Sequence, residues 1–124
     1  MMSDKNKEIL VVEDDELIRR LQKIKLEKAG YQVFEAEDGL EAWNMIQDNN
    51  YSLIIIDVFL PKLDGFQLLE NIQKQESSAK TIMLSGKSQE KDIKKAYNIG
   101  VDSYMTKPFD SDDLVETVKS VLEN

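Results

Sequence analysis

The stretch Leu53–Asp57 constrains the fold of this chain more than any other part of the sequence. Its run of leucine and isoleucine is too short to cross a membrane, and its β-branched side chains favour a strand buried on both faces of a sheet. The strand ends at the carboxylate of Asp57, which is costly to bury unless it meets solvent or a cation. Pro61 and Asp64-Gly65 then predict a loop and the start of a helix. Taken alone, Asp57 could equally be a polar residue that merely ends a strand.

The composition narrows the classes of function. The 124 residues suffice for one domain with its own core, and we expect a polar leader at 1–8 and a single domain at 9–124. Cysteine and histidine are both absent, which excludes disulfides, thiolate or imidazole metal ligands, and Cys or His nucleophiles in this chain. The net charge of −8 argues against nucleic acid or an anionic membrane as the main partner. Because no run approaches the roughly 20 apolar residues of a membrane helix and no signal-peptide core is present, we expect a cytoplasmic protein.

Four further strands alternate with helices along the chain. The apolar runs at 9–12, 31–36, 81–84 and 101–106 predict these strands, and a helical pattern follows each one. Short connections between alternating strands and helices predict parallel strands joined by right-handed crossovers. We therefore expect an α/β fold, an open doubly wound sheet in the order 2-1-3-4-5 with five helices on its two faces. Ligands bind such sheets beyond the carboxyl ends of the strands.

Two of the predicted helices have unusual patterns. In the first, one apolar face carries Leu17, Ile18, Leu21 and Ile24, whereas Leu26 falls outside this face. The segment 88–99 is mostly charged, and its apolar stripe consists of Ile93, Ala96, Tyr97 and Ile99. Because so little apolar area is available to hold it, we expect the helix at 88–99 to be weakly anchored.

Polar residues suited to chemistry stand where the strands end. They are Glu13 and Asp14 after the first strand, Asp57 on the third, Ser85 on the fourth and Lys107 after the fifth. Three crowded carboxylates repel one another and favour a bound cation, and Mg²⁺ needs only two or three of them besides water and a phosphate oxygen. Lys107 and Ser85 suit the oxygens of a phosphoryl group, and Asp57 can accept that group as a nucleophile. The pattern indicates Mg²⁺-assisted phosphoryl transfer.

Each of these residues also has a simpler interpretation. Asp14 or Asp15 could cap the first helix, and Asp15 is the better candidate for that role. Ser85 before Gly86 could be a loop hydroxyl, and Lys107 could be a surface lysine beside a proline turn. This interpretation requires all of them to fall at adjacent strand ends by chance, so we favour one shared site.

Spaced segments of the chain resemble a known family. They are Val12-Glu13-Asp14-Asp15, the run from Asp57 to Gly65, Leu84-Ser85-Gly86 and the run from Tyr104 to Phe109. In this order they are similar to the receiver domain of bacterial two-component response regulators, the CheY-like group. The resemblance covers the chain from about Ile9 to its end.

The resemblance implies a role for each matching residue. The Mg²⁺ ligands, with Mn²⁺ as an alternative ion, would be Glu13, Asp14, Asp57 and the main-chain carbonyl of Phe59. Asp57 would be the phosphoacceptor, Lys107 would contact the phosphoryl group, and Ser85 and Tyr104 would form the switch. The donor would be a phosphohistidine on a sensor histidine kinase or a histidine phosphotransfer protein. The response would appear on the fourth helix, fifth strand and fifth helix, and the bond that matches Lys107-Pro108 is often cis in relatives.

The resemblance also sets expectations about partners. Such a domain assists its own phosphorylation and dephosphorylation and needs no separate substrate, so we do not expect an enzyme. It would signal by noncovalent contact with a downstream target, as a monomer or a weak phosphorylation-dependent dimer. The helix at 17–29 carries Arg19, Arg20, Lys23 and Lys25, and this basic face could dock the kinase or be plain solvated surface.

Three positions vary within the family. Glu13 stands where Asp is frequent, and its longer arm would reach the metal through a water molecule. Bulky Phe59 is expected to slow loss of the phosphoryl group, so Phe59→Asn should speed autodephosphorylation. Lys87 adds charge near the phosphoryl group, with no predicted sign for its effect.

Other classes share parts of the pattern. A phosphohydrolase of the haloacid dehalogenase type also uses Asp, Ser or Thr, Lys and Mg²⁺, but its second Asp would fall on Phe59. A nucleotide-binding fold would need a glycine-rich loop after the first strand, where Glu13 and Asp14 stand instead. A receiver that binds partners without phosphorylation is a further alternative, and the complete acidic site makes us favour phosphorylation over it.

Overall fold

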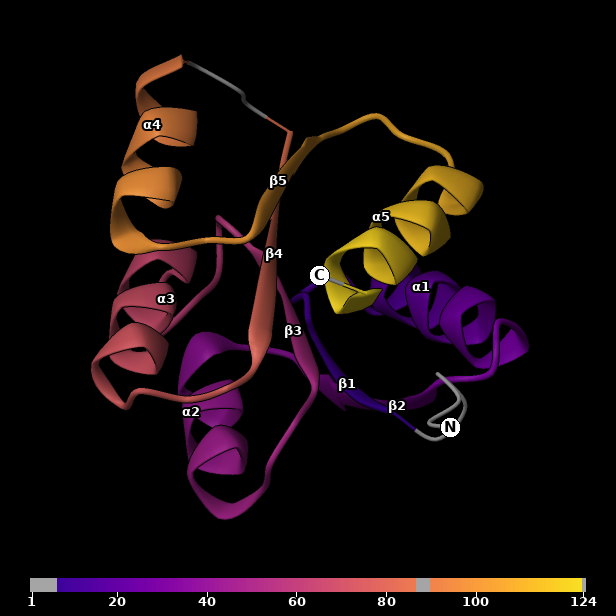
Figure 1. Cartoon of the computed structure of the whole chain (residues 1–124), viewed down its shortest axis with the longest axis horizontal. Coiled ribbons are helices and arrows are strands. Elements are labelled where there is room, and N and C mark those ends of the chain that lie inside the picture. The colour runs from indigo at the N-terminus through magenta and orange to yellow at the C-terminus, as the bar shows by residue number, and fades with distance from the viewer. Residues whose placement is uncertain (1–6, 87–89, 124) are drawn as a thin grey trace.

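Five parallel strands form the central sheet of the computed structural model, which describes residues 7–86 and 90–123 (Figure 1). The strands are β1 (Glu8–Val12), β2 (Gln32–Ala36), β3 (Leu53–Asp57), β4 (Lys80–Ser85) and β5 (Ser103–Thr106). They lie in the order β2-β1-β3-β4-β5, and every pairing is parallel. The predicted doubly wound sheet and its strand order are therefore confirmed.

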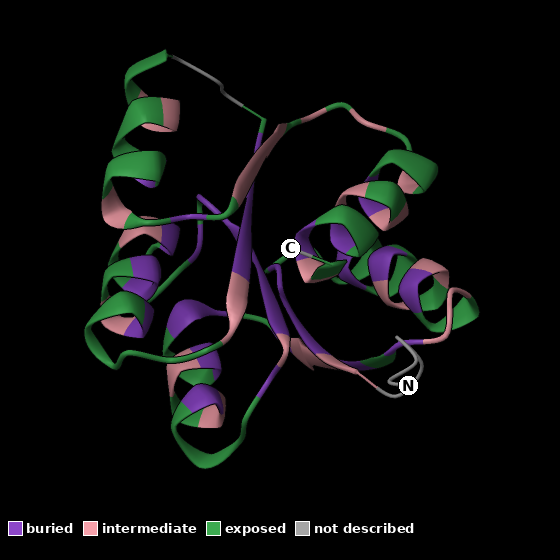
Figure 2. Ribbon diagram, in the orientation of Figure 1, coloured by how far each residue is buried: buried purple, intermediate pink, exposed green. Residues whose placement is uncertain are grey.

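The central strand β3 is buried along its whole length (Figure 2). Its side chains alternate between two hydrophobic cores, with Ile54 and Ile56 in one and Leu53 and Ile55 in the other. A run of leucine and isoleucine can remain in such a strand because both faces of a parallel sheet are covered by helices. Asp57 ends this strand and is 7% exposed.

Helices cover both faces of the sheet. They are α1 (Glu16–Lys28), α2 (Gly39–Asp48), α3 (Gly65–Lys74), α4 (Glu90–Ile99) and α5 (Ser111–Glu123). Residues of α2, α3 and α4 pack in one core and residues of α1 and α5 in the other, as their placement on opposite sides of the sheet in Figure 1 shows. Within the part of the chain that the structure describes, no helix is long and apolar enough to span a membrane.

Three aspartates fix the starts of helices that follow strand ends. Asp15, Asp38 and Asp64 are the N-caps of α1, α2 and α3, and each carboxylate accepts a hydrogen bond from a main-chain N–H three residues later. At α3 the side chain of Gln67 also accepts from the main-chain N–H of Asp64, which completes a capping box. These caps fix where the three helices begin, on the edge of the sheet that carries the site.

The face of α1 that packs on the sheet differs from the predicted apolar face. The predicted residues are exposed: Leu17 at 69%, Ile18 at 36%, Leu21 at 55% and Ile24 at 48%. The residues that α1 buries are Arg19, Gln22 and Leu26. An amphipathic pattern indicates which side of a helix is apolar, and only the fold decides whether that side meets the core or solvent. Here Leu26, which the apolar pattern left out, is the fully buried anchor of the helix.

The fourth helix has little apolar contact with the rest of the protein. Among its described residues only Ala96 is buried, and Tyr97, assigned to the apolar stripe, is 50% exposed. Its predicted start at Ser88 lies outside the described residues. β5 begins at Ser103, two residues later than predicted. Asp102 precedes it and bonds to Thr81 of β4, whose main-chain N–H donates to the Asp102 carboxylate at 2.8 Å.

Candidate functional site

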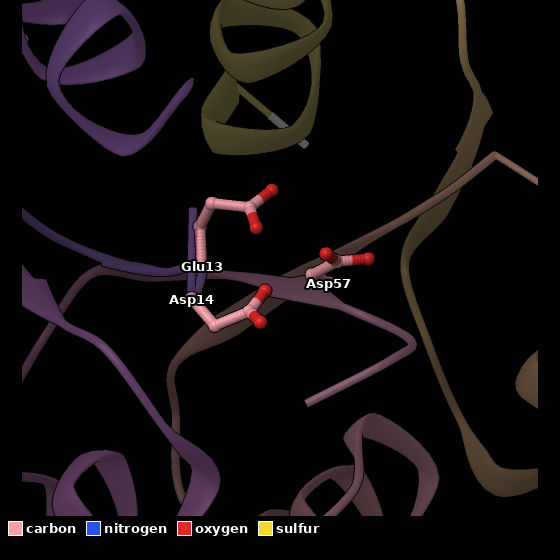
Figure 3. Close-up of side chains that lie close together, drawn as sticks. All are labelled: Glu13, Asp14 and Asp57. Carbon is pink, nitrogen blue, oxygen red and sulfur yellow. The ribbon is translucent and has the colours of Figure 1, made fainter. Parts of the chain in front are cut away.

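Three carboxylates meet at the carboxyl edge of the sheet (Figure 3). Glu13 and Asp14 follow β1, and Asp57 ends β3, the neighbour of β1. One oxygen from each carboxylate lies within 4.8 Å of the others. Asp14 is exposed, whereas Glu13 is only 2% exposed. The fold therefore brings together the acidic residues that the sequence predicted to share one site.

Lys107 reaches this cluster from the segment that follows β5. Its Nζ donates a hydrogen bond to Oε1 of Glu13 at 3.1 Å and lies 3.6 Å from Oδ2 of Asp57. The main-chain N–H of Lys107 donates to the carbonyl oxygen of Ser85 at 2.8 Å, which joins the exit of β5 to the end of β4. The Lys107-Pro108 bond is cis, as the resemblance implied. One ammonium thus contacts two of the three carboxylates, and the cluster keeps a net negative charge.

The electrostatics of the cluster follow from its burial. The pKa of Glu13 is raised from 4.5 to about 7, mainly by burial and also by the neighbouring Asp57 carboxylate, while hydrogen bonds from the N–H of Asp15 and from Lys107 act in the opposite direction. Burial also raises the pKa of Asp57, against the opposing charge of Lys107. For Lys107 burial lowers the pKa, but the Asp57 and Glu13 carboxylates outweigh it, so its pKa lies above the usual value. The lysine is therefore a permanent cation beside two carboxylates that resist ionising together.

The donor set fits a hard divalent cation such as Mg²⁺. All the donors are carboxylate oxygens, and a bound cation would relieve the repulsion that raises the pKa of Glu13. Both oxygens of Glu13 already accept hydrogen bonds, one from the N–H of Asp15 at 3.1 Å and one from Lys107. The exposed carboxylate of Asp14 therefore offers the most open oxygens of the three.

The loop after Asp57 is held close to the site by Gly65. A Cβ at this position would lie 2.5 Å from the main-chain oxygen of Asp57 and 2.8 Å from the Cα of Val58. The N–H of Gly65 donates to the carbonyl of Val58 at 2.9 Å, so α3 starts directly against the end of β3. Only glycine permits this approach. Phe59 lies within the loop and is 59% exposed, while Lys87 lies outside the described residues.

The two predicted switch residues lie on neighbouring strands. Ser85 ends β4 and is fully buried, and Thr106 of β5 is its partner in the sheet. Tyr104 of β5 is half-buried and packs against the core beneath α2, α3 and α4. Its hydroxyl is buried without a hydrogen-bond partner among the described residues. The ring therefore already lies inward in this structure.

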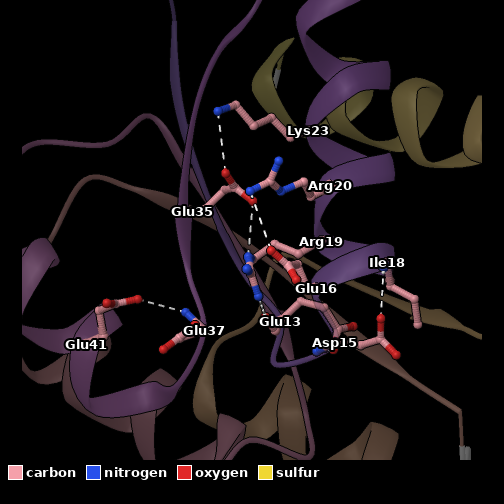
Figure 4. Close-up of polar contacts among 10 residues, drawn as sticks. All are labelled: Glu13, Asp15, Glu16, Ile18, Arg19, Arg20, Lys23, Glu35, Glu37 and Glu41. Atoms are coloured by element: carbon pink, nitrogen blue, oxygen red, sulfur yellow. Dashed lines mark hydrogen bonds and ion pairs between the residues drawn. The ribbon is translucent and has the colours of Figure 1, made fainter.

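Sequence reasoning missed two residues that support the site, Arg19 and Glu35. The predicted role of Arg19 on an exposed basic docking face is wrong, because its side chain is 9% exposed and contacts Glu35 of β2 and the main chain of Glu13 (Figure 4). The available signal was the spacing of Arg19, Gln22 and Leu26, which puts all three on one side of a helix.

Comparison with known proteins agrees with this geometry. Residues 9–119 match the sequence model of the family described as response regulator receiver domain. The transcriptional regulatory protein SrrA of Staphylococcus aureus strain NCTC 8325 / PS 47 is 36% identical over 115 residues, which cover 93% of this chain and 47% of SrrA. The chain therefore spans about half the length of this curated relative.

Solved structures of response regulator receiver domains have the same fold as this chain. The Francisella response regulator 1452 receiver domain superposes with a TM-score of 0.90 at 36% identity, covering 95% of this chain and 98% of that one. A CheY-like response regulator receiver domain protein from Methanospirillum hungatei JF-1 has a TM-score of 0.91 at 34% identity, covering 96% and 95%. Fold and similarity together define a CheY-like receiver. The chain belongs to the response regulator receiver domain family and is a receiver domain of two-component signalling.

Proposed function

We propose that Asp57 accepts a phosphoryl group from a phosphohistidine of a sensor histidine kinase or a histidine phosphotransfer protein. The observation that carries the proposal is the cluster of three carboxylates with Nζ of Lys107 at 3.6 Å from Asp57. A carboxylate oxygen of Asp57 attacks phosphorus, the phosphorus–nitrogen bond breaks, and its electron pair returns to the imidazole of the donor. The products are an aspartyl phosphate and an unmodified histidine. The domain acts on itself and turns over no separate substrate.

Each residue of the site has a part in this transfer. Glu13, Asp14, Asp57 and the carbonyl of Phe59 would hold Mg²⁺ or Mn²⁺. The bound ion supplies positive charge for the phosphoryl oxygens and relieves the carboxylate repulsion. Lys107 adds a fixed cation within reach of both Glu13 and Asp57 and so stabilises the charge that develops in the transfer.

The switch follows from the charge that phosphorylation adds. A phosphoryl group brings about −2 at neutral pH and new acceptor oxygens, to which the Ser85 hydroxyl donates. The movement of Ser85 then favours the inward position of Tyr104. Helix α4 is free to shift because Ala96 is its only buried residue among those described. The surface of α4, β5 and α5 would then present a different face to a downstream target.

The exposed apolar face of α1 supports docking of the phosphoryl donor. Ile18, Leu21 and Ile24 line a groove of about 590 Å³ between α1 and α5, which we name the α1 groove. Lys107 lines the same groove, so it is continuous with the phosphoacceptor site. Lys25 and Lys28 also line it and give it positive charge. We assign the α1 groove to an amphipathic helix of the histidine-bearing partner, which must bring its imidazole to Asp57.

We also propose a location and an assembly state for the domain. The domain works in the cytoplasm as a monomer or a weak phosphorylation-dependent dimer. Its charge of −8 disfavours direct contact with nucleic acid, although the relative SrrA is a transcriptional regulatory protein.

Intact mass after incubation with a small acyl phosphate tests the phosphoacceptor role. We expect one phosphoryl adduct with Mg²⁺, none with a chelator and none on Asp57→Asn. If folded, Mg²⁺-bound protein forms no adduct, the proposal fails and a phosphorylation-independent receiver takes its place. Steady turnover of a phosphate ester would instead favour a phosphohydrolase.

A further inference from the structure

We propose that Arg19 and Glu35 form a clamp that positions the Glu13–Asp14 turn for metal binding. Arg19 is in the first turns of α1 and Glu35 is on the edge strand β2, and neither belongs to the carboxylate cluster. The inference rests on the proposed function, since it concerns the Mg²⁺ site of that function. Arg19 acts here as a positioning residue, because it contacts the chain that carries the ligands.

The guanidinium of Arg19 makes two different contacts at once. Its Nε donates to Oε1 of Glu35 at 3.1 Å, and its Nη1 donates to the main-chain carbonyl of Glu13 at 2.8 Å (Figure 4). The Arg19 side chain is 9% exposed, and its charge-assisted bond to Glu13 is buried, while the bond to Glu35 is partly buried. Glu35 is itself held a second time, by Nζ of Lys23 at 3.4 Å. The planar fork of arginine suits this pair of acceptors, whereas the single ammonium of lysine does not.

These contacts fix the main chain that precedes Asp14. The N–H of Glu13 donates to the carbonyl of Ala36 on β2 at 3.1 Å, and the carbonyl of Glu13 accepts from Arg19. Residue 13 is therefore held on both sides. No hydrogen bond between described residues holds the carboxylate of Asp14, which is exposed. In Figure 3 the side chain of Asp14 extends toward Asp57, and the main chain that the clamp holds fixes the Cα–Cβ bond from which it does so.

The competing explanation is that Arg19 only anchors α1 or only contributes charge. The sign of one measurement separates charge from positioning. Removing a cation from the neighbourhood of a cation site should strengthen Mg²⁺ binding if charge alone matters. Removing a clamp that orients a ligand should weaken it.

The test is the Mg²⁺ affinity of the folded domain, measured by isothermal titration calorimetry at fixed pH and ionic strength. We expect Arg19→Met and Arg19→Lys to bind Mg²⁺ about tenfold more weakly, the lower end of the size expected for one lost charge-assisted bond. Glu35→Gln should give a smaller loss. Arg19→Met combined with Glu35→Gln should match Arg19→Met alone, because the two residues act as a unit.

Arg20→Met is the matched control. Arg20 is the next residue on α1, its side chain is 64% exposed, and it pairs with Glu16 on the surface. This change removes the same charge from the same helix without touching the turn, so the Mg²⁺ affinity should stay within about twofold. Circular dichroism and urea unfolding must show that each variant is folded during the titration. Arg19→Lys keeps the charge, and it decides the question if Arg19→Met does not fold.

The outcomes separate the two proposals. A wild-type domain that binds no Mg²⁺ overturns both the proposed function and the clamp. A wild type that binds Mg²⁺, with folded Arg19 variants that bind it as tightly or more tightly, overturns the clamp alone. Equal losses in Arg19→Met and Arg20→Met would also overturn it, since the loss would then not depend on the contacts that Arg19 makes with Glu35 and Glu13.

Discussion

Replacing Glu13 by glutamine should stabilise the metal-free domain at alkaline pH. Glu13 is 2% exposed, and burial beside Asp57 raises its pKa to about 7 from the ordinary 4.5. Between these two pH values the folded state binds more protons than the unfolded state. The stability that the protonated carboxyl allows is fully present below pH 4.5, and it is lost as the pH rises through about 7. Glutamine cannot ionise, so it escapes this loss.

The size of the effect follows from the same values. Each unit of difference between the pKa values of 4.5 and about 7 corresponds to about 1.4 kcal/mol in the free energy of unfolding. The ionised carboxylate can therefore destabilise the domain by at most about 3 kcal/mol above pH 8. The amide oxygen of the introduced glutamine would still accept from the N–H of Asp15 or from Lys107, but with weaker bonds, a loss of about 1 kcal/mol. We therefore expect a net gain of about 1–2 kcal/mol in the free energy of unfolding, or roughly 3–8 °C in Tm.

Urea unfolding with a chelator at pH 5 and pH 8 measures this directly. The fall in the free energy of unfolding from pH 5 to pH 8 should be larger for wild type than for Glu13→Gln. At pH 8, Mg²⁺ should restore the stability of wild type and should raise that of the variant less. Glu70→Gln, at an exposed site on α3, is the control and should change stability by less than about 0.5 kcal/mol. If Glu13→Gln is less stable than wild type at pH 8 without metal, the account of the buried carboxylate is refuted.

Three further changes probe other parts of the site. Gly65→Ala should lower the free energy of unfolding by about 2–3 kcal/mol, because its Cβ would meet the main-chain oxygen of Asp57 at 2.5 Å; a neutral result in urea would contradict the close approach. Tyr104→Phe removes a buried hydroxyl without a partner among the described residues, so it should raise stability by about 1 kcal/mol; a loss would mean that the hydroxyl is bonded. Leu21→Asp, at a 55% exposed position in the α1 groove, should slow phosphoryl transfer from a histidine protein at least tenfold. The same variant should label normally with an acyl phosphate, and equal slowing of both reactions would argue against docking there.

Much of the fold could be predicted because local chemistry and topology agree. The buried strand β3 has no polar residue before Asp57, and the aspartates at 15, 38 and 64 mark helix starts that the structure keeps. Parallel strands then bring their carboxyl ends to one edge, so residues far apart in sequence could be assigned to one site.

The packing face of α1 could not be predicted for a physical reason. Its apolar residues follow a regular helical spacing, and this pattern is the same whether the face meets the core or a partner protein. The buried side depends on Arg19, whose burial is tolerable only because Glu35 lies beside it on β2. That neighbour is set by the register of β1 with β2, where Val11 pairs with Glu35. No local pattern in the sequence contains this register.

The central claim is that Asp57, and neither Glu13 nor Asp14, carries the phosphoryl group. Labelling with an acyl phosphate and Mg²⁺, reduction with borohydride and peptide mass mapping test it directly, because reduction converts an aspartyl phosphate to homoserine at the labelled position. We predict homoserine at position 57 of the wild-type domain and nowhere else, and none without Mg²⁺. Homoserine at position 14, a reduced side chain at position 13, or an unchanged peptide 53–57 from protein that carries the adduct would contradict the account.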